Sequence, residues 1–224
     1  MEELLNKIHN VDCFDLFKML PDKSIDLVVI DPPYNLAYNG RGKVNSFEVF
    51  AGDKMELGDY AEFMYNVFKE CYRVLRDDTA IYCFIDYRKY PLFYELVGKD
   101  FDIKNCLVMD KGSIGMGQHY RFQHEFCIYA IKGKHKLRLE KKNVSDVWNF
   151  KRQCGATSIH PTQKDVEVLK KIIQYSSDKG QIVLDCFSGS GSTCVAAKAI
   201  GRQFICSEVD PAYVLKAQAR LGLT

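Results

Sequence analysis

Short apolar runs alternate along the chain with longer segments whose apolar residues recur every three or four positions. This alternation of strand and helix patterns predicts an α/β fold with a mostly parallel sheet. The apolar runs predict buried strands at 27–30, 80–85, 181–184 and 203–206. The periodic segments predict helices at 13–20, 59–76, 163–176, 191–200 and 210–220. Two further strands, near 105–109 and 125–131, enclose a glycine-bearing loop and are expected to pair antiparallel at one edge of the sheet.

Two stretches interrupt the alternation. The first, 35–58, is polar and contains four glycines, and so long a loop in a compact domain is usually functional or disordered. The second, 132–152, contains eight lysines and arginines against two acidic residues, so its net charge is +6. Because the whole chain carries +2, the remainder carries −4. A local basic patch of this kind favours a polyanionic partner.

Length, composition and cysteine spacing narrow the class of protein. A length of 224 residues suits one domain with an insertion, and 47% hydrophobic with 27% charged residues is ordinary for a soluble globular protein. The nine cysteines lie at least eight residues apart, which excludes C-x-x-C metal or redox spacing and predicts free, buried thiols. No apolar run approaches 18 residues, and the acidic start lacks the features of a signal peptide. We therefore expect a cytoplasmic protein without a membrane span.

The sequence Asp31-Pro32-Pro33-Tyr34 directly follows the predicted strand 27–30. Ligand sites of open parallel sheets lie beyond the carboxyl ends of the strands. Prolines fix φ and remove amide donors, so Pro32 is expected to present a carbonyl acceptor beside the Asp31 carboxylate and the ring of Tyr34. Two acceptors and a stacking ring suit an exocyclic amino group on a flat heterocycle. The alternative is an ordinary Asp-Pro turn with a surface tyrosine.

Methylation of an adenine amine would need this combination of groups. The N6 lone pair is delocalised into the ring, so acceptors on its hydrogens would be needed to concentrate electron density on the nitrogen. A sulfonium methyl group could then be attacked in line, with positioning and electrostatics supplying most of the rate. The base must leave the duplex to reach such a site, and an aromatic face usually receives it.

A glycine-rich turn, D-C-F-S-G-S-G from Asp185 to Gly191, lies between a predicted strand and a predicted helix. Glycines at such a turn let the backbone approach a ligand closely. Glu208 ends the next strand, 19 residues after Gly189, where a carboxylate can accept both hydroxyls of a ribose. A dinucleotide fingerprint would need glycine where Cys194 stands, so we expect a single nucleoside with a short charged tail.

These motifs, in this order, resemble the permuted β group of amino-group DNA methyltransferases, which use S-adenosylmethionine. That group places D-P-P-Y early and the cofactor loop F-x-G-x-G late, as Asp31–Tyr34 and Phe187–Gly191 stand here. Residues 160–164 resemble the group's segment before the helix that precedes the cofactor loop, although Asp165 stands where proline is frequent. Residues 10–13 resemble its acidic segment, without the glycine that is usual at the second position. The resemblance covers nearly the whole chain.

The resemblance implies a Rossmann-like, seven-stranded, mostly parallel sheet with helices on both faces, in circularly permuted order. Residues 1–224 would form one methyltransferase domain with a short target-recognition insertion at about 132–157. The implied activity is methyl transfer to N6 of adenine in duplex DNA. Transfer to cytosine N4 is the alternative, although those enzymes more often carry serine in place of Asp31. RNA or protein-glutamine methylation is less favoured because such enzymes usually carry asparagine there, and a non-catalytic nucleoside- or DNA-binding module is the alternative from another class.

The resemblance also implies roles for individual residues. Asp31, Pro32, Pro33 and Tyr34 would bind and activate the target amine. Glu208 would hold the cofactor's ribose, Asp12 would accept from its adenine amine, and Lys164 would meet its methionine end. The expected cofactor contacts are Asp12, Cys13, Thr162, Lys164, Asp185, Phe187, Gly189, Ser190, Gly191 and Glu208. The simpler alternatives are a helix N-cap for Asp12 and an exposed first-turn position for Lys164. No metal is expected.

The basic stretch and two loops are expected to contact double-stranded DNA. The candidate contacts are Arg41, Lys43, Arg121, Gln123, His124, Lys134, Lys136 and Arg138. The basic stretch would hold phosphates by charge, and the alternative is a solvated face with Trp148 as a packing anchor. Members of the group often form dimers, so a homodimer is a further expectation. A companion restriction enzyme is a further candidate partner. The small size of the chain is compatible with an origin in a phage or mobile element, and a bacterial origin is the alternative.

Overall fold

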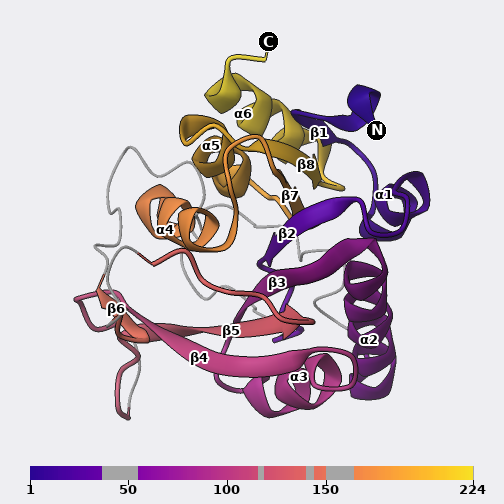
Figure 1. Ribbon diagram of the computed structural model, residues 1–224. Helices are drawn as coiled ribbons and strands as arrows, with labels where there is room; N and C mark the ends of the chain where they lie inside the picture. Colours follow the sequence, from indigo (N-terminus) through magenta and orange to yellow (C-terminus); the bar gives the residue numbers. More distant parts are fainter. Residues whose placement is uncertain (37–54, 116–118, 140–143, 150–163, 224) are drawn as a thin grey trace.

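The computed structural model describes residues 1–36, 55–115, 119–139, 144–149 and 164–223. Within them the chain forms one eight-stranded sheet and six α-helices, which lie on both faces of the sheet (Figure 1). The strands are β1 (Lys7–His9), β2 (Ile25–Ile30), β3 (Leu75–Ile85), β4 (Asp102–Asp110), β5 (His124–Lys132), β6 (Val147–Asn149), β7 (Ile182–Asp185) and β8 (Gln203–Ser207). The helices are α1 (Cys13–Met19), α2 (Leu57–Val74), α3 (Tyr90–Val97), α4 (Val166–Ser176), α5 (Ser192–Ala199) and α6 (Pro211–Leu221), preceded by a 3-10 turn at Glu2–Leu4. No helix in these ranges is long and apolar enough to cross a membrane.

The order of the strands across the sheet is β1-β8-β7-β2-β3-β5-β4-β6. Neighbouring strands are parallel from β1 to β3, β5 is antiparallel to β3 and β4, and β6 is parallel to β4. The carboxyl ends of β1, β8, β7, β2 and β3 therefore meet on one side, which also holds the start of β5 at His124; we call this side the carboxyl rim. The amino rim is the opposite side, where these five strands begin and β5 ends at Lys132.

The predicted α/β fold is confirmed, and every predicted strand and helix overlaps an observed one. The expected antiparallel pair is confirmed as β4 and β5, but β6 lies beyond β4, so the pair is not at the edge and the described sheet has eight strands instead of seven. The strands β1 and β6 were not predicted because three residues are too few to show a period. Helix α3 was not predicted because its eight residues are almost all apolar or aromatic, which leaves no polar face to mark a helical period.

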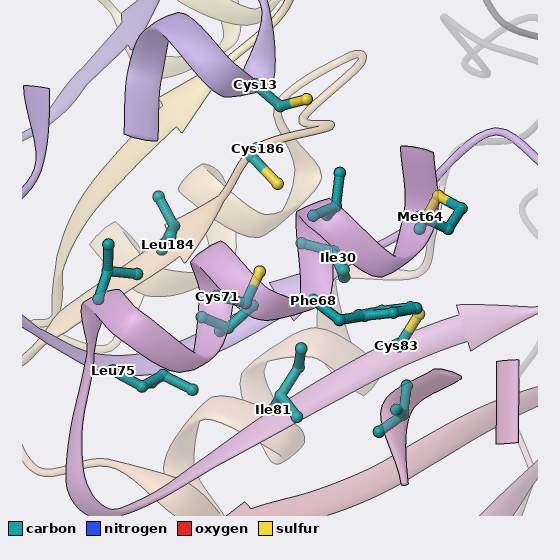
Figure 2. Close-up of a cluster of buried hydrophobic side chains, with 14 of the residues drawn as sticks. Cys13, Ile30, Met64, Phe68, Cys71, Leu75, Ile81, Cys83, Leu184 and Cys186 are labelled. Atoms are coloured by element: carbon teal, nitrogen blue, oxygen red, sulfur yellow. The ribbon is translucent and has the colours of Figure 1, made fainter. Parts of the chain in front are cut away.

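Apolar side chains fill both faces of the sheet. On one face, α1, α2 and α3 cover a cluster whose members include Phe68 of α2, Ile81 of β3 and Leu184 of β7 (Figure 2). On the other face, α4, α5 and α6 cover a second cluster that includes Ile172 and Phe204. The aromatic stripe of the predicted second helix lies in the first cluster, so its assignment to the core is confirmed.

The described cysteines are free thiols, and all of them except Cys106 are buried. Burial raises the pKa of Cys83 and Cys127 well above the ordinary value for a thiol, because the charged thiolate is poorly solvated there. The prediction of free, buried thiols is therefore confirmed for this set. Cys154 lies outside the described residues.

Candidate active site

Four carboxylates lie at the carboxyl rim, one beyond or at the end of each of four neighbouring strands. Asp12 follows β1, Glu208 follows β8, Asp185 ends β7 and Asp31 follows β2. Ligands of open α/β sheets bind at this position. The fold therefore brings together candidate residues that the sequence motifs placed in separate segments. No group of three or more histidine, cysteine, aspartate or glutamate side chains in the described ranges is arranged to hold a metal ion.

Asp31 is held through both oxygens of its carboxylate. Tyr34 Oη donates a hydrogen bond to Asp31 Oδ1, and Lys164 Nζ lies 3.0 Å from Asp31 Oδ2. Burial, with the neighbouring Asp31 charge, raises the pKa of Tyr34 well above its ordinary value, so the hydroxyl remains a donor. Each carboxylate oxygen has a second lone pair. Asp31 can therefore accept from a ligand while these two contacts remain.

The D-P-P-Y turn is fixed from α2. Tyr60, which is fully buried on that helix, donates from Oη to the carbonyl oxygen of Pro33 at 2.7 Å. Asn35 has a positive φ of 49° and exchanges two hydrogen bonds with the backbone of Met55. Its Nδ2 donates to the carbonyl oxygen at 2.7 Å, and its Oδ1 accepts from the amide at 3.1 Å. These bonds join the two ends of the segment 37–54, which lies outside the described residues.

Lys164 connects Asp31 to a carboxylate that the sequence motifs did not single out. Its Nζ donates to Glu125 Oε2 at 2.8 Å and lies 4.9 Å from the centre of the Phe84 ring. Its side chain is 15% exposed and precedes α4, so the alternative of an exposed lysine in the first helical turn is wrong. The expected contact with the methionine end of a cofactor stays a prediction.

Glu125 lies between two ammonium groups. Its Oε1 pairs with Lys111 Nζ at 2.5 Å, and its Oε2 accepts from Lys164. Burial alone would raise the pKa of Glu125, but the charges of Lys164 and Lys111 outweigh burial and lower it to about 2. Burial would likewise lower the pKa of Lys164, but Asp31 and Glu125 outweigh it and raise that pKa above its ordinary value. Two carboxylates and two ammonium groups thus lie in contact with one another, and their formal charges cancel.

Two glycines shape the turn between β7 and α5. Gly191 caps the amino end of α5 with φ +76°, and a Cβ added there would lie 2.8 Å from Ala217 Cβ on α6. The missing side chain therefore lets α5 pack against α6. Gly189 has φ +49°, and no described atom lies within 4 Å of the position its Cβ would take, so this part of the turn faces open space. The turn is tied to α6 by Arg220 Nη1, which donates to the carbonyl oxygen of Ser190 at 2.6 Å.

Asp185 and Glu208 hold this turn through backbone amides. Asp185 Oδ1 accepts from the amide of Phe187 at 3.0 Å, and burial raises the pKa of Asp185 to about 7. Glu208 Oε2 accepts from the amide of Gly189 at 2.8 Å, and Oε1 accepts from that of Asp210 at 2.9 Å. Burial also raises the pKa of Glu208. The separation of 19 residues between Gly189 and Glu208 thus corresponds to a direct contact.

Asp12 caps α1. Its Oδ1 accepts from the amide of Asp15 at 2.9 Å, so the simpler alternative of an N-cap is confirmed. The carboxylate stays exposed at the carboxyl rim, and its expected cofactor contact stays a prediction. Cys13 is buried in α1, and burial raises the pKa of its thiol. Thr162 lies outside the described residues.

Three of the expected DNA contacts lie near the candidate site. Arg121, Gln123 and His124 lead into β5 at the carboxyl rim, immediately before Glu125. Arg121 is exposed and donates from Nε to the carbonyl oxygen of Gly115 at 2.6 Å, whereas Gln123 Nε2 donates to Asp110 Oδ1 at 2.9 Å. The expected contacts Arg41 and Lys43 lie outside the described residues.

The other three expected DNA contacts, Lys134, Lys136 and Arg138, follow β5 at the amino rim. Seven residues of β3, Thr79 to Ile85, separate the two rims, and their six steps of about 3.3 Å give about 20 Å. Arg138 forms a two-point ion pair with Asp178 at 2.7 and 2.8 Å. The structure therefore does not bring these three basic residues together with Asp31.

Two described residues of the basic stretch, Lys132 and Trp148, have packing roles. Lys132 is buried, and its Nζ donates at 2.7 Å to the carbonyl oxygens of Tyr72 and Leu75 at the end of α2. A cation there complements the negative end of the helix dipole. Trp148 is 6% exposed and packs edge-on against Tyr175 of α4. The packing alternative for Trp148 is confirmed.

Comparison with known families identifies the chain. Residues 25–219 match the family model of the N6/N4 methyltransferases, which is described as DNA methylase. The chain belongs to this family. It is 30% identical to the type II methyltransferase M.HinfI of Haemophilus influenzae, over 99% of this chain and 69% of that protein. It is also 29% identical to the DNA adenine methyltransferase YhdJ of Escherichia coli K12, over 95% of this chain and 81% of that protein.

Solved structures share the fold of this DNA methylase. The M1.HpyAVI–SAM complex superposes with a TM-score of 0.74 at 24% identity and covers 96% of this chain and 98% of that chain. The cytosine-N4-specific PvuII DNA methyltransferase superposes with a TM-score of 0.76 at 15% identity, over 96% of this chain and 87% of that chain. The class I methyltransferase fold expected from the resemblance is thereby confirmed.

Proposed function

We propose that this DNA methylase transfers a methyl group from S-adenosylmethionine to N6 of adenine in duplex DNA. The observation that carries the proposal is the Asp31 carboxylate at the carboxyl end of β2, whose two oxygens are oriented by Tyr34 and Lys164 and keep lone pairs for an amine. The adenine methyltransferase YhdJ among the relatives supports adenine as the base. The presence of aspartate at position 31, where cytosine-N4 enzymes more often carry serine, favours the same choice.

The residues of the carboxyl rim fit a nucleoside cofactor. The Glu208 carboxylate is an acceptor for two ribose hydroxyls, and the open space beside Gly189 leaves room for a ligand against the turn. Asp12 supplies a second, exposed acceptor one strand beyond, suited to an adenine amine. S-adenosylmethionine, when bound, supplies an electrophilic methyl group on a sulfonium. Cys13, Asp185, Phe187, Ser190 and Gly191 would complete the cofactor contacts, with Thr162 and Lys164 towards the methionine end.

The chain's own residues would activate and orient the amine. Asp31 and the Pro32 carbonyl would accept the two amine hydrogens and direct the nitrogen lone pair towards the methyl group. Tyr34 would stack on the flipped base. Once methylated, the nitrogen would have to lose one proton. Asp31 Oδ1 and Oδ2 are the acceptors in position to take that proton.

The DNA would lie over the carboxyl rim. Arg121, Gln123 and His124 would contact it from the turn before β5, and Arg41 and Lys43 from the loop after the D-P-P-Y turn. Lys134, Lys136 and Arg138 lie at the amino rim, so they would not contact DNA that lies over the carboxyl rim. A homodimer and a companion restriction enzyme stay predictions.

The test is transfer of labelled methyl groups from S-adenosylmethionine to unmethylated duplex DNA, followed by separation of the product nucleosides. We expect N6-methyladenine from the native protein and no product from Asp31→Ala, which should bind the cofactor normally. N4-methylcytosine would contradict the choice of base and favour the alternative. Product on RNA alone would contradict the substrate class. Cofactor binding without product on any substrate would favour a non-catalytic module.

A further inference from the structure

A chain of contacts runs from Lys111 to Tyr34 through the candidate active site. Lys111 Nζ contacts Glu125 Oε1 at 2.5 Å, Lys164 Nζ contacts Glu125 Oε2 at 2.8 Å and Asp31 Oδ2 at 3.0 Å, and Tyr34 Oη contacts Asp31 Oδ1. The five groups come from four separate segments of the sequence, because Asp31 and Tyr34 belong to the same turn. Glu125 lies two contacts away from the group that would accept the amine.

We infer that Glu125 is a positioning residue for methyl transfer, which acts on the Asp31 carboxylate through the Lys164 ammonium. The inference rests on the proposed function only in that Asp31 accepts the target amine. Glu125 itself has both oxygens occupied by ammonium groups and touches neither Asp31 nor Tyr34 in the described contacts. Its effect on the reaction would therefore be indirect.

The orientation of Asp31 explains why a second carboxylate matters. Tyr34 and Lys164 each hold one oxygen, which fixes the rotation of the carboxylate group and the direction of its spare lone pairs. Lys164 can hold its oxygen in this place only if its own Nζ is fixed, and Glu125 Oε2 provides that second contact. Positioning within a fraction of an ångström decides the rate of a reaction in which the protein contributes alignment.

The charge of Glu125 has a second effect. Lys164 is largely buried between two carboxylates, which share its positive charge. Without Glu125, the ammonium group would interact with Asp31 alone and draw electron density from the oxygens that must accept the amine. Hydrogen bonds between charged groups in such surroundings are about twice as strong as neutral ones. Loss of Glu125 would therefore weaken Asp31 as an acceptor, although Asp31 itself is unchanged.

The variant Glu125→Gln keeps the size of the side chain and removes its charge, and Glu70→Gln is a matched control. Glu70 has a 29% exposed side chain, against 28% for Glu125, and it is likewise paired with a cation, Arg73, at 2.7 Å. It lies on α2, outside the candidate site. The same substitution at the two positions thus compares a partly exposed ion pair inside the candidate site with one outside it.

Steady-state kinetics on duplex DNA is the first measurement. We expect Glu125→Gln to lower kcat on the order of 10- to 100-fold, to change the KM for DNA and the Kd for S-adenosylmethionine less than about threefold, and to leave the protein folded. Glu125→Asp should recover part of kcat, because it restores the charge, and Glu70→Gln should stay within about twofold. Unchanged kcat in Glu125→Gln, or loss of cofactor binding in parallel with kcat, would overturn the inference.

A second measurement does not depend on activity. In protein labelled with ¹³C at the aspartate carboxyl carbons, the signal of Asp31 is identified by its loss in Asp31→Asn. We expect Glu125→Gln to shift this signal and Glu70→Gln to leave it in place. An unmoved Asp31 signal in Glu125→Gln would overturn the inference even if the native protein methylated no DNA, a result that would contradict the proposed function alone.

Discussion

The two rims of the sheet carry similar charged groups in different arrangements. At the amino rim, two buried charges have backbone partners: Asp26 accepts from the first amide of β7 at 2.8 Å and also pairs with Arg76, and Lys132 donates to two carbonyls at the end of α2. At the carboxyl rim, Asp31 and Glu125 are held by other side chains. The backbone contacts of Asp26 and Lys132 stabilise the fold, whereas Asp31, held by two side chains, keeps lone pairs for a ligand.

The strongest test of this comparison is the replacement of one aspartate by asparagine at each rim. Asp31→Asn should lower the rate of methyl transfer on the order of 1,000-fold, because a neutral amide is a weaker acceptor for the hydrogens of the target amine than a carboxylate. The temperature of unfolding should change little. Asp26→Asn should leave kcat within about twofold and lower the free energy of unfolding by about 1–3 kcal/mol, because the 3% exposed Asp26 loses its charge beside Arg76. Kinetics and urea unfolding measure the two effects. Equal losses of activity in both variants would contradict the comparison.

The buried carboxyl group of Asp185, at the carboxyl rim, should make the free energy of unfolding depend on pH. Burial raises its pKa from about 3.8 in the unfolded chain to about 7 in the folded protein. The folded state then holds a proton that the unfolded state has lost, so stability falls as pH rises from about 4 to about 7. The total is up to roughly 4 kcal/mol at 1.36 kcal/mol per pKa unit. Asp185→Asn removes the titrating group and should flatten this part of the profile.

The measurement is urea unfolding of the native protein and Asp185→Asn at several pH values without cofactor. The variant keeps an acceptor oxygen for the amide of Phe187, so the difference between the two proteins reports the charge. A native-minus-variant difference in free energy that is constant between pH 4 and pH 7, or that grows more favourable to the native protein with pH, would contradict the raised pKa.

The two glycines of the cofactor turn should respond unequally to alanine. Gly191→Ala places a Cβ 2.8 Å from Ala217 Cβ at φ +76°, and we expect it to lower the free energy of unfolding by about 2–3 kcal/mol. Gly189→Ala meets no described atom, so only the positive φ opposes it, at about 1 kcal/mol. Its larger effect should be on cofactor affinity. Thermal unfolding and isothermal titration separate the two, and an equal loss of stability would show that α6 does not restrict Gly191.

The smallest expected effect concerns DNA binding. Arg121→Ala at the carboxyl rim should raise the Kd for duplex DNA about tenfold and reduce its salt dependence. Replacement of Lys134, Lys136 and Arg138 together by alanine should leave the salt slope unchanged within error, because these residues lie at the amino rim. Fluorescence anisotropy at several salt concentrations is the measurement. A flatter slope in the triple variant would show that DNA also contacts the amino rim.

The sequence was sufficient to predict most of the fold and the cofactor turn. Each apolar run became a strand, and the motifs around Asp31, Gly189 and Glu208 meet at one rim because parallel strands place their ends together. The contact between Gly189 and Glu208 follows the predicted spacing. Local patterns were enough for these features, because each motif directly follows a strand.

Features that depend on contacts between distant segments could not be predicted in the same way. The role inferred for Glu125 depends on its ion pairs with Lys111 and Lys164 and on the contact between Lys164 and Asp31. A single glutamate at the start of a strand has no sequence pattern that marks such a role. The basic stretch was predicted to contact DNA because of its charge, but charge alone does not show at which rim of the sheet the stretch lies. The predicted antiparallel pairing could have located the basic stretch. A strand that runs antiparallel to its neighbours and begins at the carboxyl rim ends at the amino rim, and the basic stretch follows that end.

The first two strands of the chain obtain their partners from its last segments. Residues 7–9 of β1 pair with residues 205–207 of β8, and residues 27–28 of β2 pair with residues 183–184 of β7. Contacts across such long stretches of sequence are slow to form during folding, because the intervening chain must be ordered first. On the ribosome, β7 and β8 emerge after the six other described strands, and Asp185 and Glu208 emerge with them. Under the proposed function, a nascent chain would acquire its cofactor site only after residues 1–208 have been synthesised.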